Sequence, residues 1–143
     1  MDRLAYEEWE QRWNQLFDKY EETGYLSFSS DERIWFNVRG LINAIENGGL
    51  ISFYYNYGVD YLDDTLEDLK KIDAIKVVHL LQKVNELFPN GNPPKDIDER
   101  NEVIGSWDEQ YYDLFEELDR EFYNEQRETL EIKLDKVVKR LLN

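Results

Sequence analysis

The chain has 143 residues, and its 32 acidic against 17 basic side chains give a formal net charge of −15 and a pI near 4.4. This charge argues against direct binding to DNA, RNA or an anionic membrane, since those surfaces attract Lys and Arg. The expected partners are basic proteins, including the DNA-contacting faces of other proteins. Aromatic residues make up 15% of the chain, which indicates a folded protein. Without Cys, disulfides, thiolate metal sites and cysteine nucleophiles are excluded.

We expect a cytoplasmic protein that does not span a membrane. The first residues carry charges in a helical pattern and lack the apolar run of a signal peptide. No stretch approaches the roughly 20 apolar residues of a membrane span. The length fits one domain over residues 1–143, in which an N-terminal helix and loop (1–29) precede a larger core region (30–142).

Apolar side chains recur every three or four residues nearly throughout, which predicts helices. The first helix begins at about Arg3 and ends at Thr23-Gly24. A second helix follows Ser29, because Ser29 and Glu32 have the spacing of a capping box, and Asn47-Gly48-Gly49 ends it. The apolar positions of these two helices are Trp9, Trp13, Leu16, Phe17 and Tyr20, then Ile34, Trp35, Val38, Leu41, Ile42 and Ile45.

The middle of the chain contains one segment of ambiguous secondary structure, followed by two predicted helices. Leu50–Tyr57 is compatible with a strand or a helix, and its short length between two Gly breaks favours a short helix. Amphipathic helices then start at Asp60 and after Asp73, and their tight connection predicts an antiparallel pair. Pro89–Lys95 reads as a loop.

The spacing of apolar and acidic residues over Asp108–Glu128 predicts a single amphipathic helix with an acidic outer face. Its apolar positions are Tyr111, Leu114, Phe115, Leu118 and Phe122. Its outer acids are Glu109, Asp113, Glu116, Glu117, Glu121 and Glu128, interrupted by Arg120 and Asn124. A last helix follows, with cations near its end that suit the negative pole of the helix dipole. The fold prediction is therefore all-α, with six to eight helices.

Several segments of the chain match a known pattern. Arg33–Asn43 leads into Asn47-Gly48-Gly49-Leu50, Phe53 and Asn56, and Leu87-Phe88-Pro89 follows. Later come Leu118-Asp119 and Phe122-Tyr123. This order, over roughly Ser30 to Leu142, resembles the DNA mimic protein family of small, acidic, all-helical bacterial proteins.

The resemblance implies a function as well as a fold. In that family the studied member dimerises and occupies the DNA-binding surface of a helix-turn-helix transcription factor. The resemblance therefore implies a homodimer that binds a basic DNA-binding protein. It carries over the turn and core positions to this chain, but no individual acid, since surface acids can change between relatives without altering the fold.

The acidic residues are the candidate partner-binding site. Asp96–Glu128 contains thirteen acids and three Arg, and therefore carries a charge of about −10. DNA presents about one negative charge per 1.7 Å of its axis, which carboxylates arrayed on helices can approximate. The alternative interpretation is that these acids only stabilise helix N-termini and keep the surface soluble. The predicted partner-binding residues are Asp113, Glu116, Glu117 and Glu121, helped by Asp63, Asp64 and Glu67.

Other functions fit the sequence less well. An immunity or antitoxin protein that binds a basic toxin or nuclease would use the same electrostatics. Asp60–Asp68 lacks the spacing of a calcium loop, and His79 is the only His, so we expect no metal site, no cofactor and no enzymatic activity. We expect His79 to be a partly buried structural residue.

Two aromatic groups leave alternatives open. The aromatics that follow the Gly turn could line a ligand pocket, although core packing is the favoured interpretation. They are Phe53, Tyr54, Tyr55, Tyr57 and Tyr61. Trp9 and Trp13 could belong to the core or to a homodimer interface.

Overall fold

The computed structural model describes residues 6–142, with the backbone alone at Tyr57 and Gly58. Within this range the chain forms eight α-helices and no strand, so the all-α prediction is confirmed. The helices are α1 (Tyr6–Thr23), α2 (Ser30–Gly48), α3 (Leu50–Tyr55), α4 (Leu62–Lys71), α5 (Ile75–Asn85), α6 (Ile97–Ser106), α7 (Tyr112–Glu121) and α8 (Arg127–Leu142). Short 3₁₀ turns are η1 (Tyr25–Ser27), η2 (Tyr57–Tyr61) and η3 (Pro89–Gly91), and η4 (Phe122–Gln126) is a π-helical turn.

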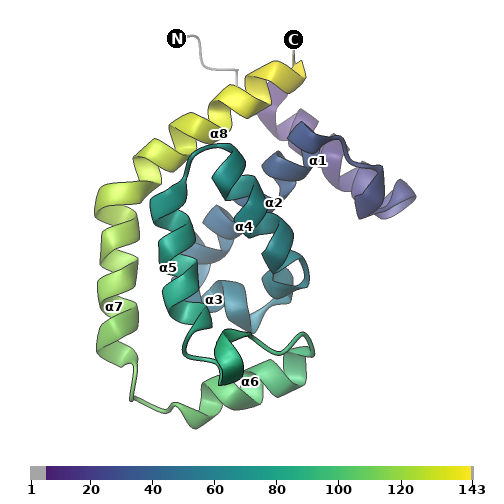
Figure 1. The fold of residues 1–143 in the computed structure, drawn as a ribbon. Helices are drawn as coiled ribbons and strands as arrows, with labels where there is room; N and C mark the ends of the chain where they lie inside the picture. Colours follow the sequence, from purple (N-terminus) through teal and green to yellow (C-terminus); the bar gives the residue numbers. More distant parts are fainter. Residues whose placement is uncertain (1–5, 143) are drawn as a thin grey trace.

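Helix α2 is central to the fold, and contacts α3, α4 and α8 (Figure 1). Its start is the predicted capping box: the Glu32 N–H donates to Ser29 Oγ (3.2 Å), and the Ser29 N–H donates to Glu32 Oε1 (2.8 Å). Its end is Gly49, whose φ of +82° lies in the region that favours glycine. Sequence and structure therefore agree at both ends of this helix.

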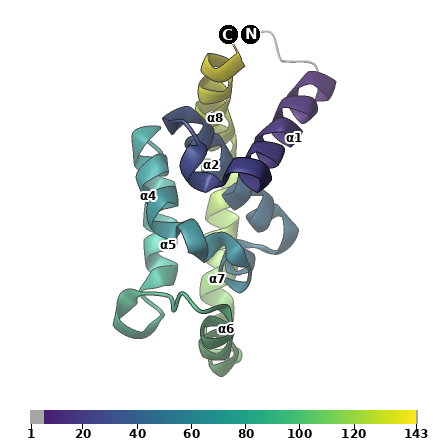
Figure 2. The same cartoon turned by 90° about the vertical axis from the view of Figure 1, so that its right-hand side faces the viewer.

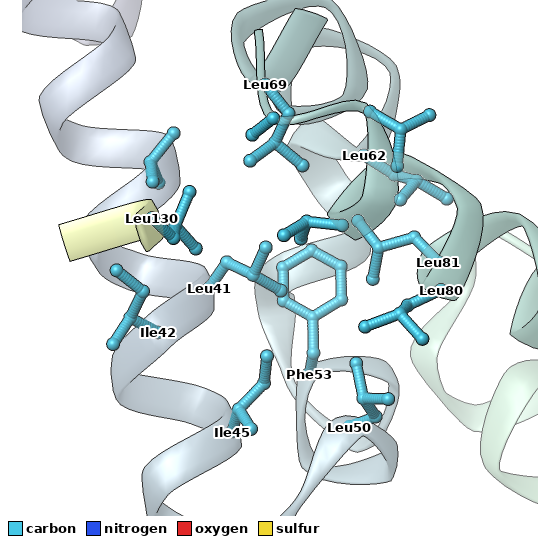
Figure 3. Packing of buried hydrophobic residues seen from close by; sticks show 14 of the residues in the cluster. Leu41, Ile42, Ile45, Leu50, Phe53, Leu62, Leu69, Leu80, Leu81 and Leu130 are labelled. Carbon is cyan, nitrogen blue, oxygen red and sulfur yellow. The ribbon is translucent and has the colours of Figure 1, made fainter. Parts of the chain in front are cut away.

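The hydrophobic core forms where α2, α3, α4, α5 and α8 converge (Figure 3). Leu41 and Ile45 of α2 face Phe53 of α3, and Ile42 lies on the side of Leu130, with all of these side chains fully or nearly fully buried. Burying each such side chain contributes about 1.5–3 kcal/mol relative to leaving it in water. Leu50–Tyr55 is helical, which confirms the favoured interpretation, and the buried Phe53 places part of the predicted aromatic group in the core.

Helices α4 and α5 form the predicted pair, joined by the tight turn Ile72–Ala74 (Figure 1). The turn uses Asp73 with φ +60°. The expectation that His79 is partly buried is wrong, because His79 is exposed. Val77, Val78, Leu80 and Leu81 define the inner face of α5. At 100° per residue His79 falls opposite that face.

Helix α1 packs on α2 through large aromatic rings, and its first turns diverge from the end of α8 (Figure 2). Trp9 and Trp13 lie 6.2 and 5.4 Å from the Trp35 ring, measured between centroids. Both rings therefore contact the core, as one of the two interpretations predicted. The predicted start of this helix near Arg3 lies outside the described residues.

The prediction of one helix over Asp108–Glu128 is wrong at its start and in its middle. Asp108 has φ +52°, and α7 begins only at Tyr112. After Glu121 the turn η4 is π-helical, so it contains more residues per turn than an α-helix. Helices α7 and α8 therefore form one bent arm around the core (Figures 1 and 2). Glu109 lies before this arm, and Glu128 lies beyond η4, in α8.

Candidate protein-binding site on helix α7

Helix α7 is fixed to the α2–α3 turn by a short polar contact. The backbone N–H of Leu50 donates to Asp119 Oδ1 at 2.8 Å. An added Cβ at Gly49 would lie 2.5 Å from Asp119 Oδ2, so only glycine lets the carboxylate approach this closely. Two residues beyond α7, Tyr123 donates its hydroxyl hydrogen to the Ile45 carbonyl at 2.9 Å. These contacts orient α7 relative to the core.

Asp119 is a partly buried acid without a cationic partner within 4 Å in the described part of the chain. Burial raises the pKa of its carboxyl group, and the hydrogen bond from the Leu50 N–H offsets this rise in part. Asp119 thus serves the start of α3, where helix N–H groups otherwise lack partners. It belongs to the inner side of α7 and is separate from the outer acids.

The structure places the four predicted α7 acids away from the core. Asp113, Glu116 and Glu117 are exposed, and Glu121 is half-buried. Glu116 pairs with Arg120 at 3.2 Å, and both side chains are 63% exposed. Among residues 6–142, no ion pair within 4 Å involves Asp113, Glu117 or Glu121. This face therefore presents uncompensated negative charge to solvent.

The three predicted α4 acids are arranged differently. Asp63 is exposed, whereas Asp64 accepts a hydrogen bond from the Tyr25 hydroxyl (2.8 Å) and lies 3.5 Å from Arg33. Glu67 lies 3.5 Å from both Arg33 and Lys71. Two of the three acids are thus partly neutralised within the molecule. The α4 acids and the α7 acids belong to different parts of the fold, since α4 packs on α2 and α7 packs on α3.

Sequence analysis missed the ion pair beneath the α4 acids. Arg33 donates from Nη2 to the fully buried Asp68 at 2.7 Å, and Asn37 donates to the same carboxylate at 2.9 Å. The hydrogen bond to Asp68 raises the pKa of Arg33, and burial offsets part of that rise. One indication was available: Asp68 falls on the inner face of α4, next to Leu69 and three residues after Thr65.

Arg100 is a second buried cation that sequence analysis missed. Its side chain is fully buried and donates to backbone carbonyl oxygens of Tyr54 (2.6 Å) and Asn56 (2.7 Å). It also donates to the Pro94 and Lys95 carbonyls, at 2.9 and 3.2 Å. Burial lowers its pKa, because the charge is removed from water. Its position four residues before the buried Ile104 of α6 was the available indication.

An aromatic groove of about 410 Å³ lies beside the α7 acids, between α3, α6 and α7. Its aromatic walls are Tyr55, Trp107, Tyr111, Tyr112 and Phe115, and its acids are Asp108, Glu116 and Asp119. The rings of Trp107 and Tyr111 meet nearly at right angles (86°), with centroids 5.3 Å apart. Of the aromatics considered for a ligand pocket, Tyr55 lines this groove, Phe53 and Tyr54 are buried, and the side chain of Tyr57 lies outside the described part of the chain.

No group of three or more His, Asp or Glu side chains among residues 6–142 is placed to hold a metal ion. No helix in the described part of the chain is both long and apolar enough to cross a membrane.

Comparison with known proteins identifies the family. Residues 26–141 match the family described as DMP19-like protein. The chain belongs to this family. The match includes the α2–α3 turn, all of α7 and nearly all of α8, and leaves the whole of α1 outside. No curated protein and no solved structure gave a significant match.

The geometry gives a physical reason for the segments by which the sequence resembles its family. Asn47-Gly48-Gly49-Leu50 and Leu118-Asp119 are about 70 residues apart along the chain, and the Leu50–Asp119 hydrogen bond joins them. Tyr123 bonds to the carbonyl of Ile45 just before the same turn. In this DMP19-like protein these segments build the support of α7.

Proposed function

We propose that this DMP19-like protein regulates a basic DNA-binding protein, in the manner of a DNA mimic, by occupying its DNA-contacting surface. The binding face is formed by Asp113, Glu116, Glu117 and Glu121 of α7. The role is one of binding, and the expected partner is a helix-turn-helix transcription factor in the cytoplasm. Asp63 on α4 is an additional contact, because it is exposed and has no described ion-pair partner.

One observation carries this proposal: three of the four α7 acids have no cation of their own within 4 Å in the described range. Like charges three and four residues apart on a helix repel each other and cost a few tenths of a kcal/mol per pair. A basic surface would relieve that repulsion. The interruption by Arg120 indicates discrete contacts to cationic side chains, as opposed to a continuous row like a DNA strand.

The test neutralises the face without changing its shape. The variant carries Asp113→Asn, Glu116→Gln, Glu117→Gln and Glu121→Gln. The control makes the same chemical changes on exposed acids of α1, at Glu7, Glu8, Glu10 and Asp18. Both variants lose four negative charges, so a difference between them reports the location of the charge. Each protein is immobilised and used to capture proteins from the native host at low salt.

The proposal predicts that the original protein and the α1 control retain a DNA-binding regulator, whereas the α7 variant does not. The captured regulator should release its own operator DNA when this protein is added, since both occupy one surface. A ternary complex with operator DNA, or undiminished capture by the α7 variant, would contradict the proposal. Capture of a toxin or nuclease in place of a regulator would favour the immunity-type alternative.

A further inference from the structure

We infer that the aromatic groove receives an arginine side chain projecting from the basic partner. This inference rests on the proposed function, and it names the chemistry of one contact next to the α7 acids. The groove is lined by α3, α6 and α7, and Glu116 belongs to both the groove and the acidic face. A partner docked on that face therefore has the groove within reach.

The walls of the groove suit a flat cation. The perpendicular rings of Trp107 and Tyr111 form a corner, and Phe115 lies 6.2 Å from Trp107 in a nearly parallel orientation (26°). Tyr112, at 71% exposed, stands at the opening with no covering element. A guanidinium or ammonium group within about 6 Å of such ring faces gains about 0.5–1 kcal/mol at an exposed site, and more when water is excluded.

The acidic residues of the groove determine the sign of the charge that its occupant carries. Asp108, Glu116 and Asp119 all line it, in a protein of net charge −15. An anion would be repelled. An apolar occupant would remove water from these carboxylates without replacing its hydrogen bonds, which is unfavourable. A cationic occupant satisfies both the carboxylates and the ring faces.

Arginine fits better than lysine for two reasons. Its planar guanidinium can stack on a ring while it donates several hydrogen bonds in the same plane, whereas an ammonium group is compact and strongly hydrated. The groove offers both aromatic ring faces and carboxylate acceptors, and its volume of 410 Å³ lies within the range of small-ligand pockets. The internal pair Glu116–Arg120 is no obstacle, because an exposed pair of this spacing is worth only about 0.3–0.5 kcal/mol.

The first test uses the isolated protein and a defined probe. N-acetyl-arginine methylamide is titrated into ¹⁵N-labelled protein, and the indole N–H signals of the four Trp are followed by NMR. Trp107 should shift in a saturable manner, while Trp9, Trp13 and Trp35 should not. The lysine analogue should bind at least about threefold more weakly. Equal shifts for both analogues, or no shift at Trp107, would overturn the inference.

The second test compares two equally exposed tyrosines. Tyr112→Ala removes a groove wall, and Tyr6→Ala is the control, since each side chain is 71% exposed and only Tyr112 lines the groove. Tyr112→Ala should weaken the arginine probe about two- to fivefold, and Tyr6→Ala should leave its affinity unchanged. Equal effects of the two variants would contradict a specific groove.

The two tests separate the inference from the proposed function. If the probe binds at Trp107 but no basic protein is captured, the groove is real and the regulatory proposal fails. If a regulator is captured through the α7 acids but Tyr112→Ala binds it as tightly as the original protein, the proposed function stands and the arginine contact is wrong.

Discussion

Gly49 and Asp119 form a tightly constrained residue contact between the α2–α3 turn and α7. Gly49 has φ +82°, and an added Cβ would lie 2.5 Å from Asp119 Oδ2. We expect Gly49→Ala to destabilise the protein by about 2 kcal/mol or more, from backbone strain and the clash together. The measurement is the free energy of unfolding in urea. Gly40→Ala is the control, and it should be neutral or slightly stabilising, since its added Cβ would meet nothing within 4 Å beyond its chain neighbours and the backbone of its own helix.

A double-mutant cycle separates the two causes. Asp119→Ala alone should cost about 1 kcal/mol, because the Leu50 N–H loses its acceptor. In the Gly49→Ala/Asp119→Ala protein the clash is absent and only the strain remains. The double variant should therefore be less destabilised than the two single variants added together. Strict additivity would show that the carboxylate does not restrict position 49.

The pKa values of two carboxyl groups should be shifted in opposite directions from their ordinary values. Burial raises the pKa of Asp119, whereas the pKa of Glu32 is lowered, because hydrogen bonds from Lys19 and Ser29 outweigh burial. For Asp119, the contribution to folding stability is present when the pH is below the ordinary Asp pKa. It is lost as the pH rises through the raised pKa of this carboxyl group. Glu32 contributes stability above the ordinary Glu pKa that is lost as pH falls through its lowered value.

Carboxyl ¹³C NMR measures both midpoints in one sample. Asp119 should titrate above the ordinary Asp value, and Glu32 below the ordinary Glu value. Substituting Lys19→Met should return the Glu32 midpoint toward normal and leave Asp119 unchanged. An Asp119 midpoint at or below its ordinary value would contradict the desolvation described for this carboxylate.

Arg100 of α6 connects several elements, because it binds the end of α3 and the segment before α6. Arg100→Ala leaves four backbone carbonyl groups without their donor. We expect a loss of about 3 kcal/mol or more in the free energy of unfolding, since hydrogen bonds to a charged group contribute about 1.5–3 kcal/mol each. Arg120→Ala, at a 63% exposed side chain, should change stability by less than about 0.5 kcal/mol.

Elements with local start and stop residues could be predicted from the sequence. Helix α2 has its Ser29–Glu32 capping box and its glycine end, and both lie where expected. The all-α class and the α4–α5 pair likewise follow from local spacing. The start of α7 could not be predicted, because Asp108 adopts a positive φ that its sequence context does not indicate. The turn η4 was missed for a similar reason, since a π turn carries no distinct apolar spacing.

The candidate site was predictable only where charge lies on a single helix. The spacing along α7 correctly separates Asp113, Glu116 and Glu117, which are exposed, from the buried Leu118. For α4 the spacing gave no indication that Arg33, some 30 residues earlier, pairs with Asp64 and Glu67. The aromatic groove was also missed, because Tyr55, Trp107 and Tyr112 meet only through tertiary packing.

For the whole molecule we expect a homodimer. The family resemblance implies one, and exposed apolar side chains such as Leu26, Ile75 and Ile132 remain on the described surface. Two chains of net charge −15 repel each other, so salt should strengthen their association. Light scattering at micromolar concentration in about 0.15 M salt should give twice the 17.3 kDa of one chain. A mass of one chain at every concentration and salt level would refute the dimer.

The π turn η4 fixes the register between the two halves of the α7–α8 arm. In an uninterrupted α-helix, Leu118 and Leu134 would point about 160° apart, because each residue adds about 100°. Both are nevertheless buried, as are Phe122 and Leu130 between them. The turn acts as one inserted residue and rotates the two apolar stripes back into line. A one-residue deletion within Phe122–Gln126 would therefore leave the two stripes in line on a continuous α-helix, whereas a one-residue insertion there would turn either the core side chains or the acids of α7 by about 100°. The Pro89–Lys95 loop can vary in length without this consequence.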